Sequence, residues 1–308
     1  MSRRFFVAGC QRSGTTMLRL VLECHPEVYC FDEATGYGVL AGQPFAVPTD
    51  RTHIGFKIPR WTECLGDDLA WDEGLPEVAE NLYQGEPIIF VTRDVRDTVA
   101  SMRKLRMTET QSWLEFCAEP ILQAKMETTP LGLRYAQEWD RIQAAGRSPV
   151  QIGALYWKYK TAMLLEFQAR RYPVLPISYE QLTADPTPHL RRVCDFLGIG
   201  WTERLLRHDQ QPHTEVFPSG LVMGNTDPAR AIDTASVNQW SDWLTPEEER
   251  DVLAIAGDLN EQIHALHAAR SQPRGLLGWL GRKIKGRPRN EPAALRMPLA
   301  NHSRIHPG

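Results

Sequence analysis

The chain has 308 residues, a formal net charge of −3 and 42% hydrophobic residues. This length and composition allow one large or two small domains with a sizeable apolar core, and the charge argues against nucleic-acid binding by the whole chain. No apolar stretch approaches the length of a membrane-spanning helix, and no signal peptide is visible. The six cysteines form no CxxC pair. We therefore expect free thiols and a cytoplasmic location.

The first predicted elements are a strand at residues 5–9, a short loop, and a helix that starts at Thr15. This arrangement directs backbone N–H groups and the positive end of a helix dipole at an anion. The spacing from Gly9 to Gly14 matches the phosphate loop of P-loop nucleoside triphosphatases, but Thr15 stands where those proteins have a lysine. An ordinary ATPase or kinase site is therefore disfavoured. We expect phosphate binding by the loop backbone, by the Arg12 guanidinium, and by the hydroxyls of Ser13, Thr15 and Thr16.

The rest of the chain alternates between predicted strands and helices. Apolar runs indicate further strands at residues 28–31, 54–58, 87–92 and 174–178. Pro176 suggests an edge or a bulge in the last of these. Residues 32–36 are expected to form a loop, and helices are expected at residues 76–83, 94–103, 152–171, 186–197 and 246–267. The pattern predicts an α/β fold, with an open parallel sheet of the P-loop type flanked by helices in a single domain over residues 1–270.

In such a sheet, ligands bind beyond the carboxyl ends of the strands. Arg93 ends one apolar strand, and Ser101 follows two helical turns later, so the pair is a candidate site for a second phosphate. The alternative is an Arg93–Asp97 ion pair between residues four apart on the helix surface.

These motifs resemble those of sulfotransferases that use 3′-phosphoadenosine 5′-phosphosulfate (PAPS). Residues 11–16 are similar to the 5′-phosphosulfate loop of that family, and Arg93 with Ser101 resembles its 3′-phosphate motif. The register from Arg12 to Glu33 and the Tyr-Glu-Gln-Leu block at residues 179–182 resemble tyrosylprotein sulfotransferases and their bacterial relatives.

The resemblance implies a role for each matching residue. Glu33 would be the general base that takes the proton of the acceptor hydroxyl, and Lys57 would stabilise the bridging oxygen as the leaving phosphate gains charge. Arg12 would hold the 5′-phosphate and the sulfuryl oxygens. Gly14 belongs to the same loop, and Tyr179 would lie near the adenine, unless it is only a packed residue at the end of a strand.

Two departures from the family pattern stand near the C-terminus. Asn225 replaces a serine that touches the cofactor but still offers a hydrogen bond, whereas Gln239 replaces a lysine and lacks its charge. Other cytosolic sulfotransferases place a histidine base two residues after the strand lysine. Pro59 occupies that position here, and His53 lies upstream, so we do not expect a histidine base.

The sequence therefore predicts a PAPS-dependent sulfotransferase that acts in line and without a metal on an acceptor hydroxyl, of a phenol, a sugar, or another small molecule or peptide. The alternatives are a P-loop kinase of a small metabolite and a non-catalytic nucleotide-binding protein.

The C-terminal residues 271–308 differ from the body in charge, with a net charge of +7 against −10 for residues 1–270. An apolar half at residues 275–281 precedes a basic half. One interpretation is weak contact with an anionic membrane surface. The other, which we favour, is a flexible basic extension or one that packs on the acidic body.

Overall fold

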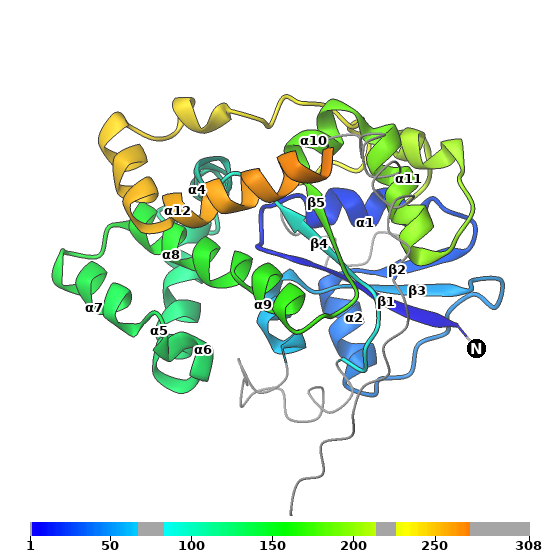
Figure 1. The fold of residues 1–308 in the computed structure, drawn as a ribbon, viewed down its shortest axis with the longest axis horizontal. Helices are drawn as coiled ribbons and strands as arrows, with labels where there is room; N and C mark the ends of the chain where they lie inside the picture. Colours follow the sequence, from blue (N-terminus) through cyan, green and yellow to red (C-terminus); the bar gives the residue numbers. More distant parts are fainter. Residues whose placement is uncertain (1, 67–82, 214–225, 272–308) are drawn as a thin grey trace, which may run out of the picture. The chain divides into compact units, whose positions relative to one another are not determined.

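The computed structural model describes residues 2–66, 83–213 and 226–271 (Figure 1). Its centre is a five-stranded sheet in the order β2-β3-β1-β4-β5, and every pair of neighbours is parallel. The strands are β1 (Arg3–Gly9), β2 (Val28–Phe31), β3 (His53–Lys57), β4 (Ile88–Thr92) and β5 (Val174–Ser178). The predicted α/β class and open parallel sheet are confirmed. Because β1 is central, the loop that follows it lies between the ends of β3 and β4.

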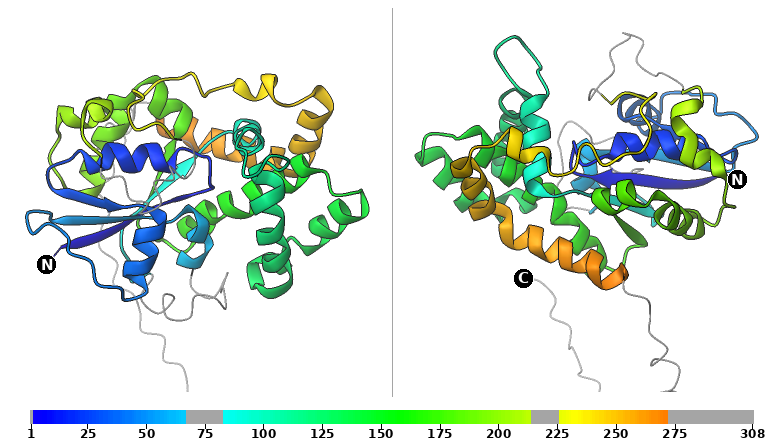
Figure 2. Two further views of the ribbon diagram at one scale, coloured as in Figure 1. Left: turned by 180° about the vertical axis from the view of Figure 1, so that it is seen from behind. Right: turned by 90° about the horizontal axis from the view of Figure 1, so that it is seen from above.

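The sheet is buried on both faces because its strands are almost continuously apolar. On β1, Phe6 and Ala8 pack into one core, and Phe5 and Val7 pack into the other. Helices lie on both sides of the sheet (Figure 2). Those that pack in the core of Phe5 are α1 (Thr15–Glu23), α10 (Tyr179–Ala184) and α11 (Pro186–Leu197). Those in the core of Phe6 include α4 (Val95–Lys104), α8 (Pro149–Thr161), α9 (Met163–Ala169) and α12 (Pro246–Ser271).

The remaining elements are short. After β3 comes the 3-10 segment η1 (Pro59–Leu65), and after α4 comes a π-helical turn η3 (Leu114–Ala118). The others are α5 (Glu119–Thr128), α6 (Pro130–Leu133), α7 (Ala136–Ala144), η4 (Glu203–Gln210) and η5 (Gln239–Asp242). No helix in the part of the chain that the structure describes is both long and apolar enough to cross a bilayer.

The expected loop at residues 32–36 is wrong, because these residues begin the helix α2 (Glu33–Leu40). Asp32 caps this helix, and its carboxylate accepts hydrogen bonds from the backbone N–H groups of Ala34 and Thr35. At Gly36 the helix backbone lies close to β2, and a Cβ added there would lie 3.1 Å from Phe31 Cβ. The close packing therefore favours glycine at this position. The Asp32 cap therefore starts a helix although its two glycines, Gly36 and Gly38, are typical of loops.

The single helix predicted over residues 152–171 is also wrong, because it divides at Ala162 into α8 and α9. The Leu165 N–H donates to the Ala162 carbonyl only three residues before it, which tightens the backbone there. The prediction of an edge strand with Pro176 is confirmed, since β5 is the last strand of the sheet. The tail beyond residue 271 and nearly all of the predicted helix at residues 76–83 lie outside the described residues.

Candidate active site

The loop between β1 and α1 has a strained backbone that its glycines permit. Gly9, Arg12 and Gly14 have φ values of 138°, 69° and 94°. An added Cβ on Gly9 would lie 2.3 Å from the carbonyl oxygen of Val91, and one on Gly14 would lie 2.4 Å from the ring of Tyr179. Glycine is required at both positions because both the backbone angle and the space exclude a side chain.

The segment η1 holds the start of this loop through Thr62. Thr62 of η1 donates its hydroxyl hydrogen to the Gly9 carbonyl at 2.7 Å and accepts the Gly9 N–H at 2.9 Å. Ser13 is fully buried, and its hydroxyl has no hydrogen-bond partner among the residues that the structure describes. The start of the loop is therefore held at Gly9 by Thr62 through both backbone polar groups.

The structure brings most of the predicted cofactor residues to one pocket. Seven of them line it: Arg12, Gly14, Thr15, Thr16, Arg93, Ser101 and Tyr179. They come from the ends of β1, β4 and β5 and from the helices that follow these strands. Ser13 does not line the pocket, and Asn225 lies outside the described residues.

Two arginines meet in this pocket. Arg12 Nε donates to Ser101 Oγ at 3.2 Å, and Arg93 Nη1 donates to the Arg12 carbonyl at 2.9 Å. The Arg93 guanidinium lies 4.7 Å from the centre of the Tyr179 ring. Burial, and then the charge of Arg93, lower the pKa of Arg12 to about 10. Arg12 therefore remains a cation at neutral pH, and the two guanidinium groups together form a site suited to an anion.

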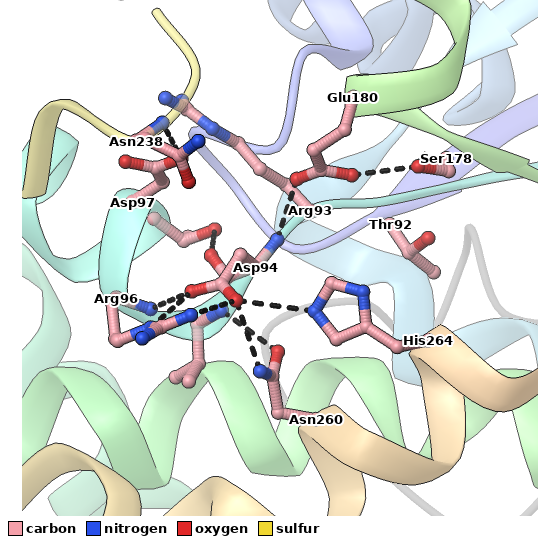
Figure 3. Close-up of polar contacts among 12 residues, drawn as sticks. Thr92, Arg93, Asp94, Arg96, Asp97, Ser178, Glu180, Asn238, Asn260 and His264 are labelled. Carbon is pink, nitrogen blue, oxygen red and sulfur yellow. Dashed lines mark hydrogen bonds and ion pairs between the residues drawn. The ribbon is translucent and has the colours of Figure 1, made fainter.

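The alternative reading of Arg93, an ion pair with Asp97, is not what the structure shows. The Asp97 carboxylate accepts the backbone N–H group of Asn238 at 2.7 Å (Figure 3) and that of Trp240 at 3.1 Å. Arg93 instead donates to backbone carbonyls, including that of Ser236. Asp97 thus anchors the segment after residue 236 beside the pocket, while Arg93 faces the pocket.

Of the three residues with a predicted catalytic role, Arg12 lines the pocket, whereas Glu33 and Lys57 lie beside the loop, outside the residues that line it. Glu33 Oε2 is 3.6 Å from Lys57 Nζ, and Lys57 Nζ donates to Thr16 Oγ1 at 3.3 Å. The other carboxylate oxygen of Glu33 accepts the Arg60 N–H at 2.6 Å. Both side chains are largely buried, with 14% of Glu33 and 11% of Lys57 exposed. A carboxylate and an ammonium group therefore stand at the first turn of α1, where the loop ends.

His53 has hydrogen-bond partners other than Glu33 and Lys57. Its Nε2 lies 3.2 Å from the Leu197 carbonyl, and its Nδ1 lies 2.9 Å from the Thr52 hydroxyl. Both ring nitrogens thus contact α11 and the residue that precedes β3.

A comparison with protein families identifies the class of this chain. The model of the sulfotransferase family matches residues 4–42 and 80–203, which is just over half of the sequence. The chain belongs to the sulfotransferase family. Its activity is therefore transfer of a sulfuryl group, and the kinase and non-catalytic alternatives are not supported. The matched residues include the loop at residues 9–16 and the motif from Arg93 to Ser101.

Similar proteins agree with this assignment. A putative protein-tyrosine sulfotransferase of Caenorhabditis briggsae is 20% identical over 260 residues, which cover 82% of this sulfotransferase and 85% of the relative. Protein-tyrosine sulfotransferase 2 of Gallus gallus is 22% identical over 270 residues, which cover 82% and 66%. Among solved structures, the sulfotransferase domain of the Synechococcus PCC 7002 olefin synthase is similar in fold, with a TM-score of 0.50, 17% identity, and coverage of 84% and 94%.

The sulfotransferase pocket also contains residues that sequence reasoning missed. Lys104, His208 and Arg230 line it, together with Thr226, Asp227 and Gln239 from the segments where the family pattern departs. Arg230 Nε donates to Asp233 Oδ2 at 2.8 Å. Arg230 adds a cation to the pocket, which Gln239 does not. No motif signalled it, since it lies in an irregular segment between helices.

Proposed function

We propose that this sulfotransferase uses PAPS as its donor and an acceptor hydroxyl as its nucleophile, with cationic side chains carrying the charge. An anionic donor is supported by the side chains that line the pocket, because Arg12, Arg93 and Ser101 lie there together with Gly14, Thr15 and Thr16 of the loop and the first turn of α1. The proposed assignment is that the loop and Arg12 hold the 5′-phosphosulfate, while Arg93 and Ser101 hold the 3′-phosphate.

One observation carries the proposed chemistry: Lys57 Nζ lies 3.6 Å from Glu33 and 3.3 Å from the hydroxyl of Thr16. In the proposed step, Glu33 takes the acceptor proton as the acceptor oxygen forms a bond to sulfur. The bond from sulfur to the 5′-phosphate oxygen breaks, and 3′-phosphoadenosine 5′-phosphate (PAP) leaves. Lys57 and Arg12 stabilise the charge that develops on the leaving phosphate.

Positioning supports the same proposal. The Arg60 N–H and the Lys57 side chain contact the two oxygens of Glu33, so the protein itself sets the direction of the carboxylate. A preorganised base costs no reorganisation at the moment of reaction.

The acceptor is proposed by chemistry and by analogy. A carboxylate base suits a hydroxyl nucleophile, and the curated relatives carry the name protein-tyrosine sulfotransferase. Peptidyl tyrosine is therefore the first acceptor class to test, before simple phenols and sugars.

The test begins with radiolabelled PAPS and tyrosine-containing peptides, phenols, sugars and fractionated cell extract. With the labelled acceptor in hand, Glu33→Gln and Lys57→Ala should lower turnover by at least about 100-fold, and for Glu33→Gln the PAP dissociation constant measured by calorimetry should stay within about twofold of wild type. The matched control is Glu86→Gln, whose carboxylate pairs with Arg4 at 3.2 Å at the amino end of the sheet. Wild-type turnover by Glu33→Gln would show that Glu33 is not the base.

A further inference from the structure

Side chains of the helix α12 contact the residue before Arg93 and the residue after it in the sequence. His267 Nε2 lies 2.8 Å from the Thr92 hydroxyl, just before Arg93. Just after it, His264 Nε2 lies 3.1 Å from Asp94 Oδ2 (Figure 3). The two histidines and Asn260 follow the spacing that places residues on one helix face. One face of α12 therefore brackets the turn that carries Arg93.

Asn260 makes the most specific of these contacts. Its Nδ2 donates to Asp94 Oδ2 at 3.0 Å, and its Oδ1 accepts the Val95 N–H at 3.0 Å. Asn260 is only 5% exposed. An amide that is satisfied at both ends in a buried position fixes both the carboxylate and the first residue of α4.

Other elements hold the remaining groups of the turn. Trp157 Nε1 of α8 donates to the Arg93 carbonyl at 3.0 Å. The Asp94 N–H donates to Glu180 Oε1 at 2.8 Å, and Ser178 Oγ donates to the other oxygen of Glu180 at 2.6 Å. The backbone on both sides of Arg93 is thus defined by partners that are distant in sequence.

Asp94 has more partners than helix capping needs. Capping uses a single bond, from the Arg96 N–H at 2.8 Å. Asp94 is buried, and its pKa is held well below its usual range by hydrogen bonds from His264, Arg96 and Asn260, which outweigh the opposing effect of burial. Burying a carboxylate is unfavourable unless its partners are well placed. Such an arrangement beside Arg93 indicates a requirement for precise backbone placement.

Arg93 itself has limited freedom. Its guanidinium donates to the carbonyls of Arg12 and Ser236, and its buried Nε has no hydrogen-bond partner among the described residues. A small rotation of the turn would therefore move the guanidinium away from the pocket that it lines.

We propose that Asn260 and His264 are positioning residues that set Arg93 for the 3′-phosphate of the donor. They lie outside the residues that the sulfotransferase family model matches. The inference rests on the proposed function, because it takes Arg93 as the ligand of that phosphate.

The experiment compares two ligands and needs no acceptor. Calorimetry measures the binding of PAP and of adenosine 5′-monophosphate (AMP), which lacks the 3′-phosphate. In His264→Leu and Asn260→Asp, PAP should bind about tenfold more weakly, as outer-shell changes commonly cause, while AMP affinity stays within about twofold of wild type. His264→Gln keeps an N–H donor for Asp94 and should restore the preference for PAP. Gln262→Leu, at an exposed position of α12, is the matched control.

The variant Arg93→Met distinguishes failure of the proposed function from failure of the positioning inference. If wild type does not prefer PAP over AMP, or if Arg93→Met keeps that preference, the proposed function is wrong at this site. If Arg93→Met loses the preference but His264→Leu and Asn260→Asp both retain it, the positioning inference is overturned. A parallel loss of both ligands would also overturn it, since that result indicates a merely structural role.

Discussion

Arg12 Nε donates a hydrogen bond of 3.2 Å to Ser101 Oγ, across 89 positions of the sequence. This contact joins the loop after β1 to the second turn of α4. Since Arg12 and Ser101 belong to the two proposed phosphate positions, the bond links those positions directly.

The first prediction concerns the shape of the Arg12 side chain. Arg12→Lys keeps the positive charge but removes the planar set of donors that reaches both Ser101 and an anion. We expect PAP to bind at least about tenfold more weakly, the loss typical of one charge-assisted hydrogen bond. Calorimetry at fixed salt measures the change. Arg4→Lys, at the amino end of β1, should leave the affinity unaltered, and wild-type affinity in Arg12→Lys would refute the prediction.

Gly14→Ala is predicted to destabilise the protein through contact with Tyr179. An added Cβ would lie 2.4 Å from the Tyr179 ring, in a residue with φ of 94°. Gly85 has the same φ and no atom within 4 Å of an added Cβ. Gly85→Ala should therefore cost only the backbone term of about 1 kcal/mol, whereas Gly14→Ala should cost about 1–3 kcal/mol more. Urea unfolding measures both variants, and equal losses would contradict the predicted clash.

A buried ion cluster under η1 gives a third prediction. Glu63 and Lys160 are both fully buried and paired, and Lys125 Nζ lies 3.1 Å from Glu63. Lys160 also donates to the Arg60 carbonyl at 2.6 Å. Lys160→Met removes one partner of this buried pair and should cost about 3–5 kcal/mol of unfolding free energy.

The exposed pair of Arg134 and Glu166 provides the comparison. Glu166→Gln should change the unfolding free energy by less than about 1 kcal/mol. Chemical denaturation of both variants under one set of conditions measures the difference. A Lys160→Met variant as stable as Glu166→Gln would show that the buried charges are dispensable for folding.

The contact between His264 and Asp94 predicts a dependence of stability on pH. The hydrogen bond with Asp94 raises the pKa of His264 above its ordinary value of 6.5; the Glu180 charge acts in the same direction, whereas burial and Arg96 oppose the shift. A pKa raised by folding stabilises the native state below the unfolded pKa, and the stabilisation is lost as pH rises through the folded value. The melting temperature of wild type should therefore exceed that of His264→Gln most at about pH 5.5, and the difference should shrink by about pH 8.5. A constant difference across this range would exclude the linkage.

The sequence was sufficient for the elements with strong local signals. The bounds of β2 and β5 were predicted to the residue, because short apolar runs ended by polar residues or proline have few alternatives. The glycine loop was predicted because its spacing reflects the geometry of the turn. The helix α2 was missed since Gly36 reads as a loop residue, although Asp32 supplied a capping signal.

The parts of the site that depend on tertiary contacts were not predictable in this way. Asn260 and His264 reach Asp94 over 166 and 170 positions, and no spacing rule connects them. Arg230 lines the pocket from an irregular segment. Local patterns thus predicted residues that the structure brings to one pocket, whereas the residues that hold them in place emerge only from the packing of α12 and of the loops.

The place of Pro176 in the outermost strand has a consequence for association between molecules. Proline lacks an N–H, so it is accommodated in a strand only where that missing donor faces away from the neighbouring strand. Pro176 pairs in register with Phe90 on its inner side, and its outer side is the border of the sheet. A strand from a second molecule approaching β5 would meet an interrupted row of donors. The border is thereby protected against extension into larger sheets, and any self-assembly of this sulfotransferase is expected to use a different surface.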